Sequence, residues 1–553
     1  MAESLLSVSD ALAGKRILLT GSTGFLGKVT LSMLLHRYGE VLDRVWVLVR
    51  RGSSLSAEAR FVEKVVRSEP FLPLRERMGE QQAEEFAVGR CSVLDGDITD
   101  PLLGLSEETL GRLAGQVDVV VNCAGLVSFN PPLEVGLKVN TYGVRNAVEL
   151  CQRLEVPLVH VSTAFVVGNR SGLVFEDEEI QGYFPRKHEV DGRDFSLQHE
   201  LDDAARLLKR LKEEAEDHAL TSEFRTKAQE RLEEEGRDAR DEKTLRLAVG
   251  RERKLWLTQK FTEAGMERAR SWGWPNTYTY TKSLGEQVVA GAPGLRYAIV
   301  RPSIVESALR YPFPGWNEGF TTSAPLAYAG LKGHRFIPAA DRAILDMIPV
   351  DLVAGSLIAI VARTLTTPER RVYQQTSGDV NPFYASRSVE LVGLYRRKFF
   401  RDKETGSRLL NEVKSRVEPQ AVSKRDFFAR SAPLFAAGAK LLKKGIEEYG
   451  PRWGAPRVSA VLERAHDQLG SLDEQASSLT SLIDLFLPFL WENRYVFRCD
   501  NTRALYQQMA PEDAAKIPWD PHALDWRRYF LDVHLPGLEK WVFPGLEEER
   551  ERR

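Results

Sequence analysis

Cysteine is scarce in this sequence, and neither sign of charge is in excess. The 553 residues include four cysteines, none of them in a CxxC pair, and 76 Lys and Arg stand against 78 Asp and Glu. Such sparse cysteines exclude a disulfide framework and a cysteine-built zinc site. The nine histidines form no HExxH motif, so we expect no metal. Balanced charge argues against nucleic-acid binding, which needs surplus cations to neutralise phosphates.

Long apolar segments are also missing. Residues 1–21 pass from a short polar lead into an expected strand, without the charged, apolar and cleavage regions of a secretory signal. The run Leu482–Trp491 is interrupted by Asp484 and Pro488. As a helix it would reach about 15 Å, which is half of a bilayer core. We therefore expect a cytoplasmic protein without a transmembrane segment.

Apolar runs alternate with amphipathic stretches between about residues 15 and 165. The runs are Arg16–Thr20, Val45–Val49, Val117–Asn122 and Leu158–Ser162, and Gly27–His36 has the apolar spacing of a helix. Unbroken Val- and Leu-rich runs are typical of strands that helices cover on both faces. The pattern predicts an α/β protein with a Rossmann-type, doubly wound parallel sheet.

Charge density rises in the middle of the chain. More than half of the residues from Glu200 to Lys254 are Asp, Glu, Lys or Arg, a composition that builds no core alone. Helical spacing of the apolar residues predicts one or two solvated helices with a narrow stripe of Leu201, Ala205, Leu208, Leu211 and Ala215. We expect these helices to support neighbouring elements, rather than to form a mobile lid or an arm that binds a partner.

The composition changes again after the expected strand Leu295–Val300. Helical patterns punctuated by Pro and Trp follow from about residue 376, so we place a boundary near Asn381 and Pro382. We expect a first domain over residues 1–380, with the charged helical insertion at about 186–273, and a mainly helical domain over 381–553.

A glycine-rich turn directly follows the first expected strand. Gly21 permits a tight turn, Gly24 lets the backbone approach a pyrophosphate, and Gly27 lets the helix pack closely on the strand. The start of the helix offers free N–H groups to a phosphate. This TGxxGxxG turn between a strand and a helix predicts dinucleotide binding.

The end of the second strand favours NADPH over NADH. An NAD site places an acidic residue there, whereas this chain has Arg50 and Arg51. A guanidinium can pair with the additional phosphate of NADP, and Arg60 could join Arg50 in that role. The alternative is that these arginines are solvated loop charges, which fits Arg51 and Arg60 better than Arg50.

Two later strand ends also fit a dinucleotide. Asp97 follows the third strand, where a carboxylate can accept from the adenine amino group, and the small residues Ala124 and Gly125 follow the fourth. Cys123 could act as an acyl-accepting nucleophile, but no base that would form its thiolate is evident. We interpret Cys123 as a packing residue.

A Tyr–Lys pair carries the expected acid–base chemistry. Tyr278 and Lys282 are four residues apart, which places them on one face of a helix. A phenol has a pKa of about 10, and a neighbouring ammonium together with oxidised nicotinamide should lower it. Thr163, after the fifth strand, can hydrogen-bond the same substrate oxygen. We prefer Thr163 to Ser162 because side chains alternate along a strand.

Several longer motifs resemble those of extended short-chain dehydrogenase/reductases, and more closely those of alcohol-forming fatty acyl-CoA reductases. They are TGSTGFLGKV, VSTAFVVG, NTYTYTKSLGEQ, IVRPSIVESALRYPFPGW and IPVDLVA. The segments Tyr495–Asn501 and Asp525–His534 are similar to that family's helical C-terminal domain. The charged insertion shows the weakest likeness.

The resemblance implies roles for individual residues. It implies catalysis by Thr163, Tyr278 and Lys282. It implies an NADP-binding reductase domain whose cofactor contacts are Gly21, Ser22, Thr23, Gly24, Phe25, Leu26, Arg50, Arg60, Asp97, Ile98, Ala124, Gly125, Lys282, Pro302, Ser303 and Ile304.

The resemblance also implies the reaction. With NADPH, a long-chain fatty acyl-CoA or acyl-carrier-protein thioester would become an aldehyde and then a primary alcohol. Alternatives are a reductase that stops at the aldehyde, a nucleotide-sugar epimerase or dehydratase, and a non-catalytic NADP sensor. Residues Phe320–Leu331 could line an acyl tunnel or pack in the core, and Lys440, Lys443 and Lys444 could contact phosphates or solvent. Peripheral membrane contact and the oligomeric state stay open.

Overall fold

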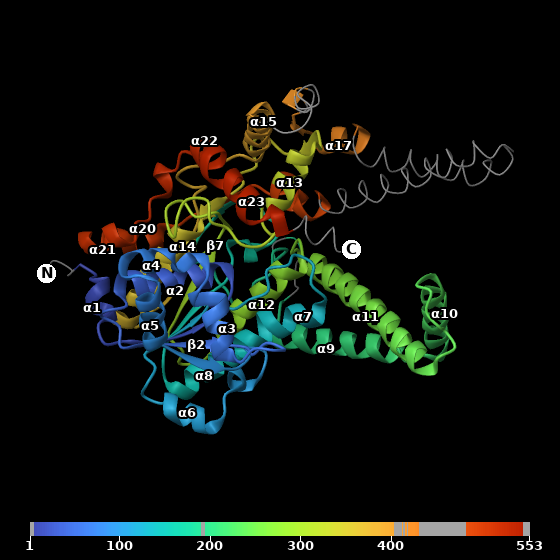
Figure 1. The fold of residues 1–553 in the computed structure, drawn as a ribbon, viewed down its shortest axis with the longest axis horizontal. Helices are drawn as coiled ribbons and strands as arrows, with labels where there is room; N and C mark the ends of the chain where they lie inside the picture. The colour runs from blue at the N-terminus through green and yellow to red at the C-terminus, as the bar shows by residue number, and fades with distance from the viewer. Residues whose placement is uncertain are drawn as a thin grey trace.

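The computed structural model describes residues 5–187, 189, 194–402, 412, 415–416, 418–430 and 483–545. At its centre is a parallel sheet of seven strands in the order β11-β7-β5-β4-β1-β2-β3 (Figure 1). Its strands are β1 Arg16–Thr20, β2 Arg44–Val49, β3 Cys91–Asp95, β4 Val119–Asn122, β5 Leu158–Val161, β7 Tyr297–Pro302 and β11 Arg370–Gln375. The predicted α/β class and doubly wound parallel sheet are confirmed.

Helices cover both faces of this sheet, which explains its unbroken apolar strands. Ile17 and Leu19 of β1 belong to the core beneath α2 and α14, whereas Leu18 belongs to the core that includes residues of α8. Successive side chains therefore serve opposite layers. The helices of these layers and their connections are α1 Val8–Leu12, α2 Phe25–Tyr38, α3 Ala57–Phe61, α4 Leu72–Met78, α5 Glu80–Arg90, α6 Glu107–Leu113, α7 Leu133–Leu137, α8 Gly143–Leu154, α12 Thr277–Gly291 and α14 Val350–Thr366.

The strand order places the expected site at one edge of the sheet. β1 lies between β2 and β4. Strands β2 and β3 lie on one side of β1, and strands β4, β5, β7 and β11 lie on the other, so the strand order changes direction at β1. In such sheets the crevice beyond the carboxyl ends of the strands, at this change of direction, is where ligands bind. The residues that follow β1, β4 and β5 therefore lie together at the carboxyl ends of the strands.

The insertion forms three helices, so the expectation of one or two was too few. They are α9 Leu197–Glu214, α10 His218–Glu234 and α11 Glu242–Trp272, and they project from the body of the molecule (Figure 1). Asp217 and Asp241 cap the starts of α10 and α11, so their carboxylates divide the charged run into separate helices. One residue of the predicted apolar stripe was wrong, because Ala205 is exposed and its neighbour Ala204 is buried instead.

The C-terminal part is mainly helical and joins the part that contains the seven-stranded sheet through a shared core. This core combines residues between Ala324 and Val353 with residues between Phe383 and Phe543. Short parallel strands also join the two parts, because β13 Tyr495–Phe497 pairs with β6 Gly172–Val174 and β12 Gln420–Val422 pairs with β9 Phe336–Pro338. The remaining elements are β8 Ile304–Glu306, α13 Ala324–Lys332, β10 Met347–Pro349, α15 Ala385–Asp402, α17 Lys424–Arg430, α20 Asp500–Gln507, α21 Pro511–Lys516, α22 Trp526–Arg528 and α23 Leu535–Trp541.

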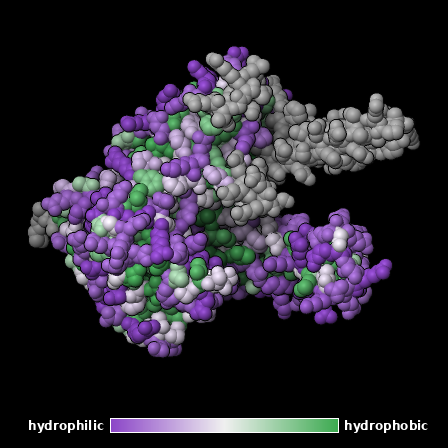
Figure 2. Space-filling view, in the orientation of Figure 1, coloured by the Kyte–Doolittle hydropathy of each residue, from purple (hydrophilic) through white to green (hydrophobic). Residues whose placement is uncertain are grey.

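The outer surface of the view in Figure 2 is mostly hydrophilic, and hydrophobic residues show in the recess between the body and the insertion. Among the described residues, no helix has both the length and the apolar composition to cross a bilayer. Lys440, Lys443 and Lys444 lie outside the described residues. The segment Phe320–Leu331 includes most of α13, whose Ala324 and Ala327 pack in the shared core.

Candidate active site

The glycine-rich turn is packed so tightly that two of its glycines have no substitute. Gly21 has a φ of 77°, and a Cβ there would lie 2.6 Å from the backbone nitrogen of Ala124. A Cβ on Gly27 would lie 2.1 Å from the carbonyl oxygen of Gly21. A Cβ on the exposed Gly24 would meet nothing closer than 3.4 Å, so the lack of a side chain leaves room above the turn.

The start of α2 offers unpaired donors at this turn. Gly24 is the N-cap and supplies no side-chain hydrogen bond, so the first N–H groups of the helix stay free for an anion. Ser22 is fully buried, and its hydroxyl has no hydrogen-bond partner within the described residues. Thr23, Phe25 and Leu26 complete the turn and the first helical residues. These residues therefore fit a dinucleotide.

The arginines after β2 separate into two groups. Arg50 donates to Asp97 over 3.2 Å, and Arg60 donates to the carbonyl oxygen of Arg50 over 2.6 Å. Arg51 instead pairs with Asp95 on β3. Arg50 and Arg60 thus lie together, whereas Arg51 is paired with Asp95 and lies apart from them.

Asp97 and Ile98 lie in the loop after β3, beside this arginine pair. Partial burial of Asp97 acts to raise the pKa of its carboxyl, but hydrogen bonds from Thr99 and Arg50 hold that pKa below its usual value. Ile98 is buried, and its carbonyl oxygen accepts from Asn146 over 2.8 Å. The carboxylate is therefore ionised and available as an acceptor.

The expected catalytic residues converge at the end of β5. Asn276 caps α12 by accepting from the N–H of Thr279 over 2.9 Å, so that Tyr278 and Lys282 stand on its first two turns. The side chain of Tyr278 lies close enough to Thr163, which is 4% exposed, for their hydroxyls to interact. Lys282, also 4% exposed, donates to the carbonyl oxygen of Val161 over 3.0 Å. The three residues predicted from sequence thus lie together.

Burial governs the ionisation of this pair, and the expected acidification of Tyr278 is not found. Burial raises the pKa of Tyr278 to about 12, although the hydrogen bond with Thr163 opposes the rise. Burial lowers the pKa of Lys282 to about 8, against the opposing charge of Glu286. The ammonium lies against the Val161 carbonyl, and desolvation dominates the pKa of the phenol.

The neighbours of Lys282 are small for a steric reason. Gly125 lies directly beside the ammonium, since a Cβ there would stand 2.7 Å from Nζ. Ala124 donates its N–H to Thr20 at the end of β1 over 3.3 Å. Burial raises the pKa of the Cys123 thiol to about 12, against the opposing effect of Lys282, so the residue stays a thiol. This agrees with the interpretation of Cys123 as a packing residue.

The end of strand β7 borders the same site. Pro302 ends β7, and its carbonyl oxygen accepts from the hydroxyl of Thr163 over 3.4 Å. Ser303 donates its N–H to Gln375 over 3.0 Å, and Ile304 begins β8. The hydroxyl of Ser162 is buried and has no partner among the described residues. Thr163, rather than Ser162, thus makes the contact with Tyr278.

An ionic cluster that sequence reasoning missed holds the insertion on the catalytic helix. Glu200 on α9 is 2% exposed and accepts from the hydroxyl of Tyr280 on α12. Arg268 donates to both oxygens of Glu200 over 2.7 and 2.9 Å, and Trp272 donates over 2.9 Å. Glu200 sits in a run of charged residues, so no spacing distinguishes it from its solvated neighbours.

Aromatic side chains from the C-terminal part cover the site. The ring of Phe129, after β4, lies 6.4 Å from that of Tyr278 and 5.4 and 5.5 Å from those of Phe486 and Phe489. Phe165 contacts Phe489 at 5.0 Å. The apolar run Leu482–Trp491 was examined in the sequence only as a possible membrane segment, so this role was missed.

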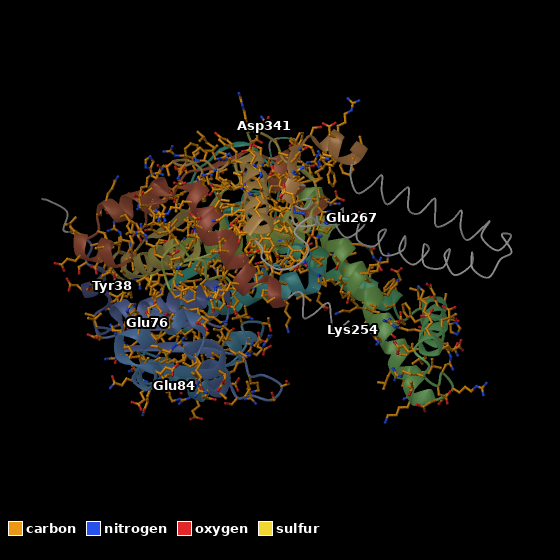
Figure 3. All side chains as sticks on the ribbon, turned by 45° about the horizontal axis from the view of Figure 1, so that its top comes forward. Tyr38, Glu76, Glu84, Lys254, Glu267 and Asp341 are labelled. Atoms are coloured by element: carbon orange, nitrogen blue, oxygen red, sulfur yellow. The ribbon has the colours of Figure 1, made fainter. Side chains whose placement is uncertain are left out.

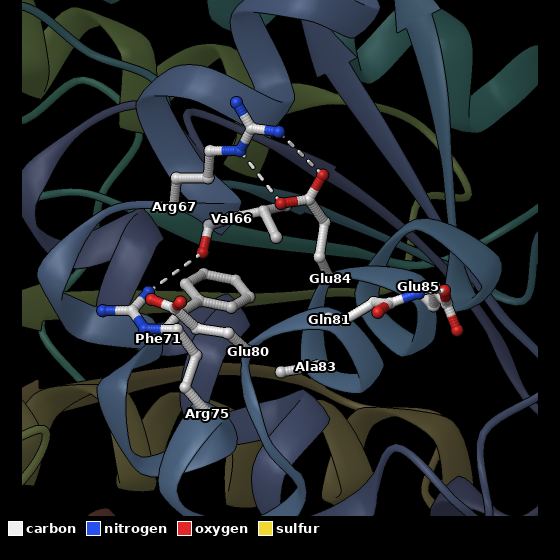
Figure 4. Close-up of a pocket in the computed structure, with 9 residues that line it drawn as sticks. All are labelled: Val66, Arg67, Phe71, Arg75, Glu80, Gln81, Ala83, Glu84 and Glu85. Atoms are coloured by element: carbon white, nitrogen blue, oxygen red, sulfur yellow. Dashed lines mark hydrogen bonds and ion pairs between the residues drawn. The ribbon is translucent and has the colours of Figure 1, made fainter.

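A cavity of about 600 Å³ lies away from the candidate active site (Figure 4). Two of its charged residues are paired with each other, since Arg67 donates to both oxygens of Glu84 over 2.9 and 3.0 Å. Arg75 donates to backbone carbonyls. None of the predicted site residues lines it. In the described part of the chain, no group of three His, Cys, Asp or Glu residues is arranged to hold a metal ion.

Comparison with known proteins gives consistent matches. An NAD-binding family model described as Male sterility protein matches residues 19–357. The Arabidopsis thaliana protein "Fatty acyl-CoA reductase 2, chloroplastic" is 28% identical over 98% of this chain and 80% of its own length. The "Alcohol-forming fatty acyl-CoA reductase" of Simmondsia chinensis is 28% identical over 98% of this chain and 99% of its own length.

Solved structures show the same fold. The terminal R domain of the myxalamid PKS-NRPS pathway has a TM-score of 0.51 at 18% identity, over 99% of this chain and 94% of that domain. The reductase domain of a non-ribosomal peptide synthetase from Mycobacterium tuberculosis has a TM-score of 0.51 at 17% identity, over 96% of this chain and 95% of that domain.

We predict that Glu200→Ala loosens the catalytic helix. The change leaves Arg268, Trp272 and the buried Tyr280 without their shared acceptor, which should cost about 3 to 5 kcal/mol of stability. Hydrogen exchange should become faster in α11 and α12. Glu213→Ala, which removes only the exposed pair with Lys209 at 3.7 Å, is the control and should change little. Equal exchange in the two variants would contradict the anchoring role.

Proposed function

We propose, from the fact that this chain belongs to the male sterility protein family, that it reduces long-chain fatty acyl thioesters to primary alcohols with NADPH. It is an enzyme that reduces a fatty acyl-CoA with a nicotinamide cofactor, as the names of its curated relatives indicate. The preference for NADPH, the long acyl chain, the choice between CoA and carrier protein, and the residues that act are the proposed parts.

The pairing of Tyr278 with Thr163 beside the buried Lys282 is the observation that carries the proposal. Two hydroxyls at the end of β5 can bind one carbonyl oxygen from two directions. Their hydrogen bonds strengthen as negative charge develops on that oxygen, so the pair favours the tetrahedral species over the bound thioester.

The residues around the first turn support a bound dinucleotide. Gly21, Gly24 and the start of α2 would hold its pyrophosphate, and Asp97 with Ile98 would hold its adenine. Arg50, with Arg60 beside it, would hold the phosphate that distinguishes NADP from NAD. Bound NADPH supplies the hydride for each reduction.

Tyr278 is the proposed proton donor in both reductions. With a pKa of about 12 it is protonated at neutral pH and can protonate an alkoxide. In the first step the tetrahedral hemithioacetal releases the thiol and leaves an aldehyde. In the second step Tyr278 protonates the alkoxide formed from that aldehyde. Lys282 stands one turn further along α12, where its ammonium stabilises the phenolate that remains.

The product of palmitoyl-CoA reduction tests this function. Purified protein, palmitoyl-CoA and NADPH are incubated, the free thiol and oxidised cofactor are counted, and the lipid is identified. We expect two cofactor molecules oxidised per thiol, with hexadecanol as product. One per thiol with hexadecanal would replace the proposal by a reductase that stops at the aldehyde, and no thiol release would exclude both.

Tyr278→Phe should lower kcat by at least two orders of magnitude, because it removes the proton donor and leaves the ring in place. NADPH binding, measured by fluorescence titration, should be nearly unchanged. Tyr183→Phe is a control, since that hydroxyl donates to the carbonyl oxygen of Val167. Near-full turnover by Tyr278→Phe would remove this residue from the mechanism.

The parent enzyme should prefer NADPH over NADH by at least tenfold in kcat/KM, and Arg50→Asp should narrow that ratio because a carboxylate repels the additional phosphate. Arg51→Asp is the matched control, because Arg51 pairs with Asp95 and should not contact the cofactor. Equal use of both cofactors by the parent, or equal effects of the two variants, would refute the assignment.

The rate of thioester reduction should fall as the pH rises through about 8. The pKa of Lys282 is lowered to that value, so its ammonium is present below pH 8 and is lost above it. Lys282→Arg keeps the positive charge and should move the fall to higher pH, even if the rate is lower. A parent profile of kcat/KM that stays flat up to pH 10 would contradict this role of the charge.

A further inference from the structure

A pocket of about 680 Å³ lies next to the catalytic tyrosine, between the loop after β4 and α11. Asn130 contributes to it from the loop, and Thr262, Met266 and Arg270 contribute from one face of α11. Asn130 directly follows Phe129, whose carbonyl oxygen accepts from the N–H of Tyr278 over 3.1 Å. The wall of the pocket is thus one residue away from the backbone that holds the catalytic tyrosine.

The pocket is built on a helix with two distinct faces. Phe261, Gly265 and Ala269 of α11 are buried against the body. Thr262, Met266 and Arg270 repeat at the same spacing of four residues, one position further along, and line the pocket. Figure 3 shows Glu267 where α11 meets the body and Lys254 further out on the same helix. The pocket therefore belongs to the base of the insertion.

Asn130 presents an unpaired acceptor at the wall. Its amide oxygen Oδ1 is buried and has no hydrogen-bond partner within the described residues. A buried acceptor without a partner loses its hydrogen bond to water and gains none, so such an atom at a pocket indicates a donor supplied by a ligand.

Charge excludes a phosphate from the interior of the pocket. Glu263 and Glu267 line it alongside Arg270. Hydrogen bonds from Gln259 and Lys260 hold the pKa of Glu263 below its usual value, so this carboxylate is ionised. Arg270 in turn lies close enough to Asp484 for their charges to interact. A neutral ligand with amide N–H donors, amide carbonyls and some apolar surface fits this lining.

We propose that this pocket binds the pantetheine arm of the thioester substrate, an assignment that rests on the proposed function. The arm is the part of an acyl-CoA or acyl carrier protein next to the sulfur, and its two amides are uncharged. The hydroxyl of Thr262 donates its proton to the carbonyl oxygen of Thr258 over 2.8 Å, so its oxygen is left as an acceptor. Asn130 and Thr262 accept from amide N–H groups, Arg270 donates to an amide carbonyl, and Met266 contacts the geminal methyl groups. The volume lies within the range of small-molecule sites.

The two reductions give this proposal an internal control. The thioester carries a pantetheine arm in the first reduction, but the aldehyde of the second reduction has lost it. A residue that binds the arm should therefore affect the first reduction alone, whereas a residue that merely supports Tyr278 should affect both.

The test compares four substrates with NADPH: palmitoyl-CoA, palmitoyl-pantetheine, S-ethyl thiopalmitate and hexadecanal. Asn130→Ala should lower kcat/KM about tenfold for the two substrates with the arm, as expected for one lost hydrogen bond to a buried group. It should leave S-ethyl thiopalmitate and hexadecanal within twofold of the parent. Thr262→Val, which keeps the side-chain shape, should give the same pattern if Asn130→Ala folds poorly.

Lys254→Ala, on α11 outside the pocket, is the matched control and should change none of the four rates. Equal losses on all four substrates in the Asn130 and Thr262 variants would overturn the assignment in favour of a supporting role. An effect on palmitoyl-CoA without one on palmitoyl-pantetheine would also overturn it, because the contacts would then lie on the nucleotide. A parent inactive on palmitoyl-CoA and hexadecanal would overturn the proposed function itself.

Discussion

Lys282 donates a hydrogen bond to the carbonyl of Val161 from an almost fully buried position, and this contact ties the helix α12 to the end of β5. Other positions of α12 have partners of their own. The N–H of Tyr278 binds the carbonyl of Phe129, and Glu286 binds Arg301 of β7 through bonds of 2.9 and 3.1 Å. Because these contacts come from different segments, Tyr278 is held relative to the sheet and the loop after β4 at once. The hydroxyl of Tyr280, which donates to Glu200, adds a contact with the insertion.

The burial that fixes α12 also sets the chemistry of its side chains. Removal of water disfavours charge, so the phenol of Tyr278 becomes a weaker acid and the ammonium of Lys282 a stronger one. A phenol with a high pKa holds its proton until an alkoxide forms, which suits a donor in a reduction. The lysine charge lies close to its titration point at neutral pH, so in the proposed mechanism the charge that supports the donor is the pH-sensitive part of the site.

Segments outside the nucleotide-binding sheet complete the site. Glu200 joins α9 and α11 to the catalytic helix, and the pocket at Asn130 lies where α11 meets the loop after β4. Phe486 and Phe489 reach Phe129 from the C-terminal part. The loops of the sheet can therefore hold a dinucleotide by themselves, while under the proposal the segments around it contact the thioester substrate.

The sequence by itself determined the features that depend on neighbouring residues. Unbroken apolar runs identified the buried strands, the tight approach of Gly21 and Gly27 follows from the turn, and a spacing of four put Tyr278 and Lys282 on one helix face. Tertiary structure alone decided that Glu200 meets Tyr280, that the insertion forms three helices and that Asn130 borders a pocket. It also decided the pKa values, because desolvation depends on every atom around a group, including atoms from segments far away in the chain.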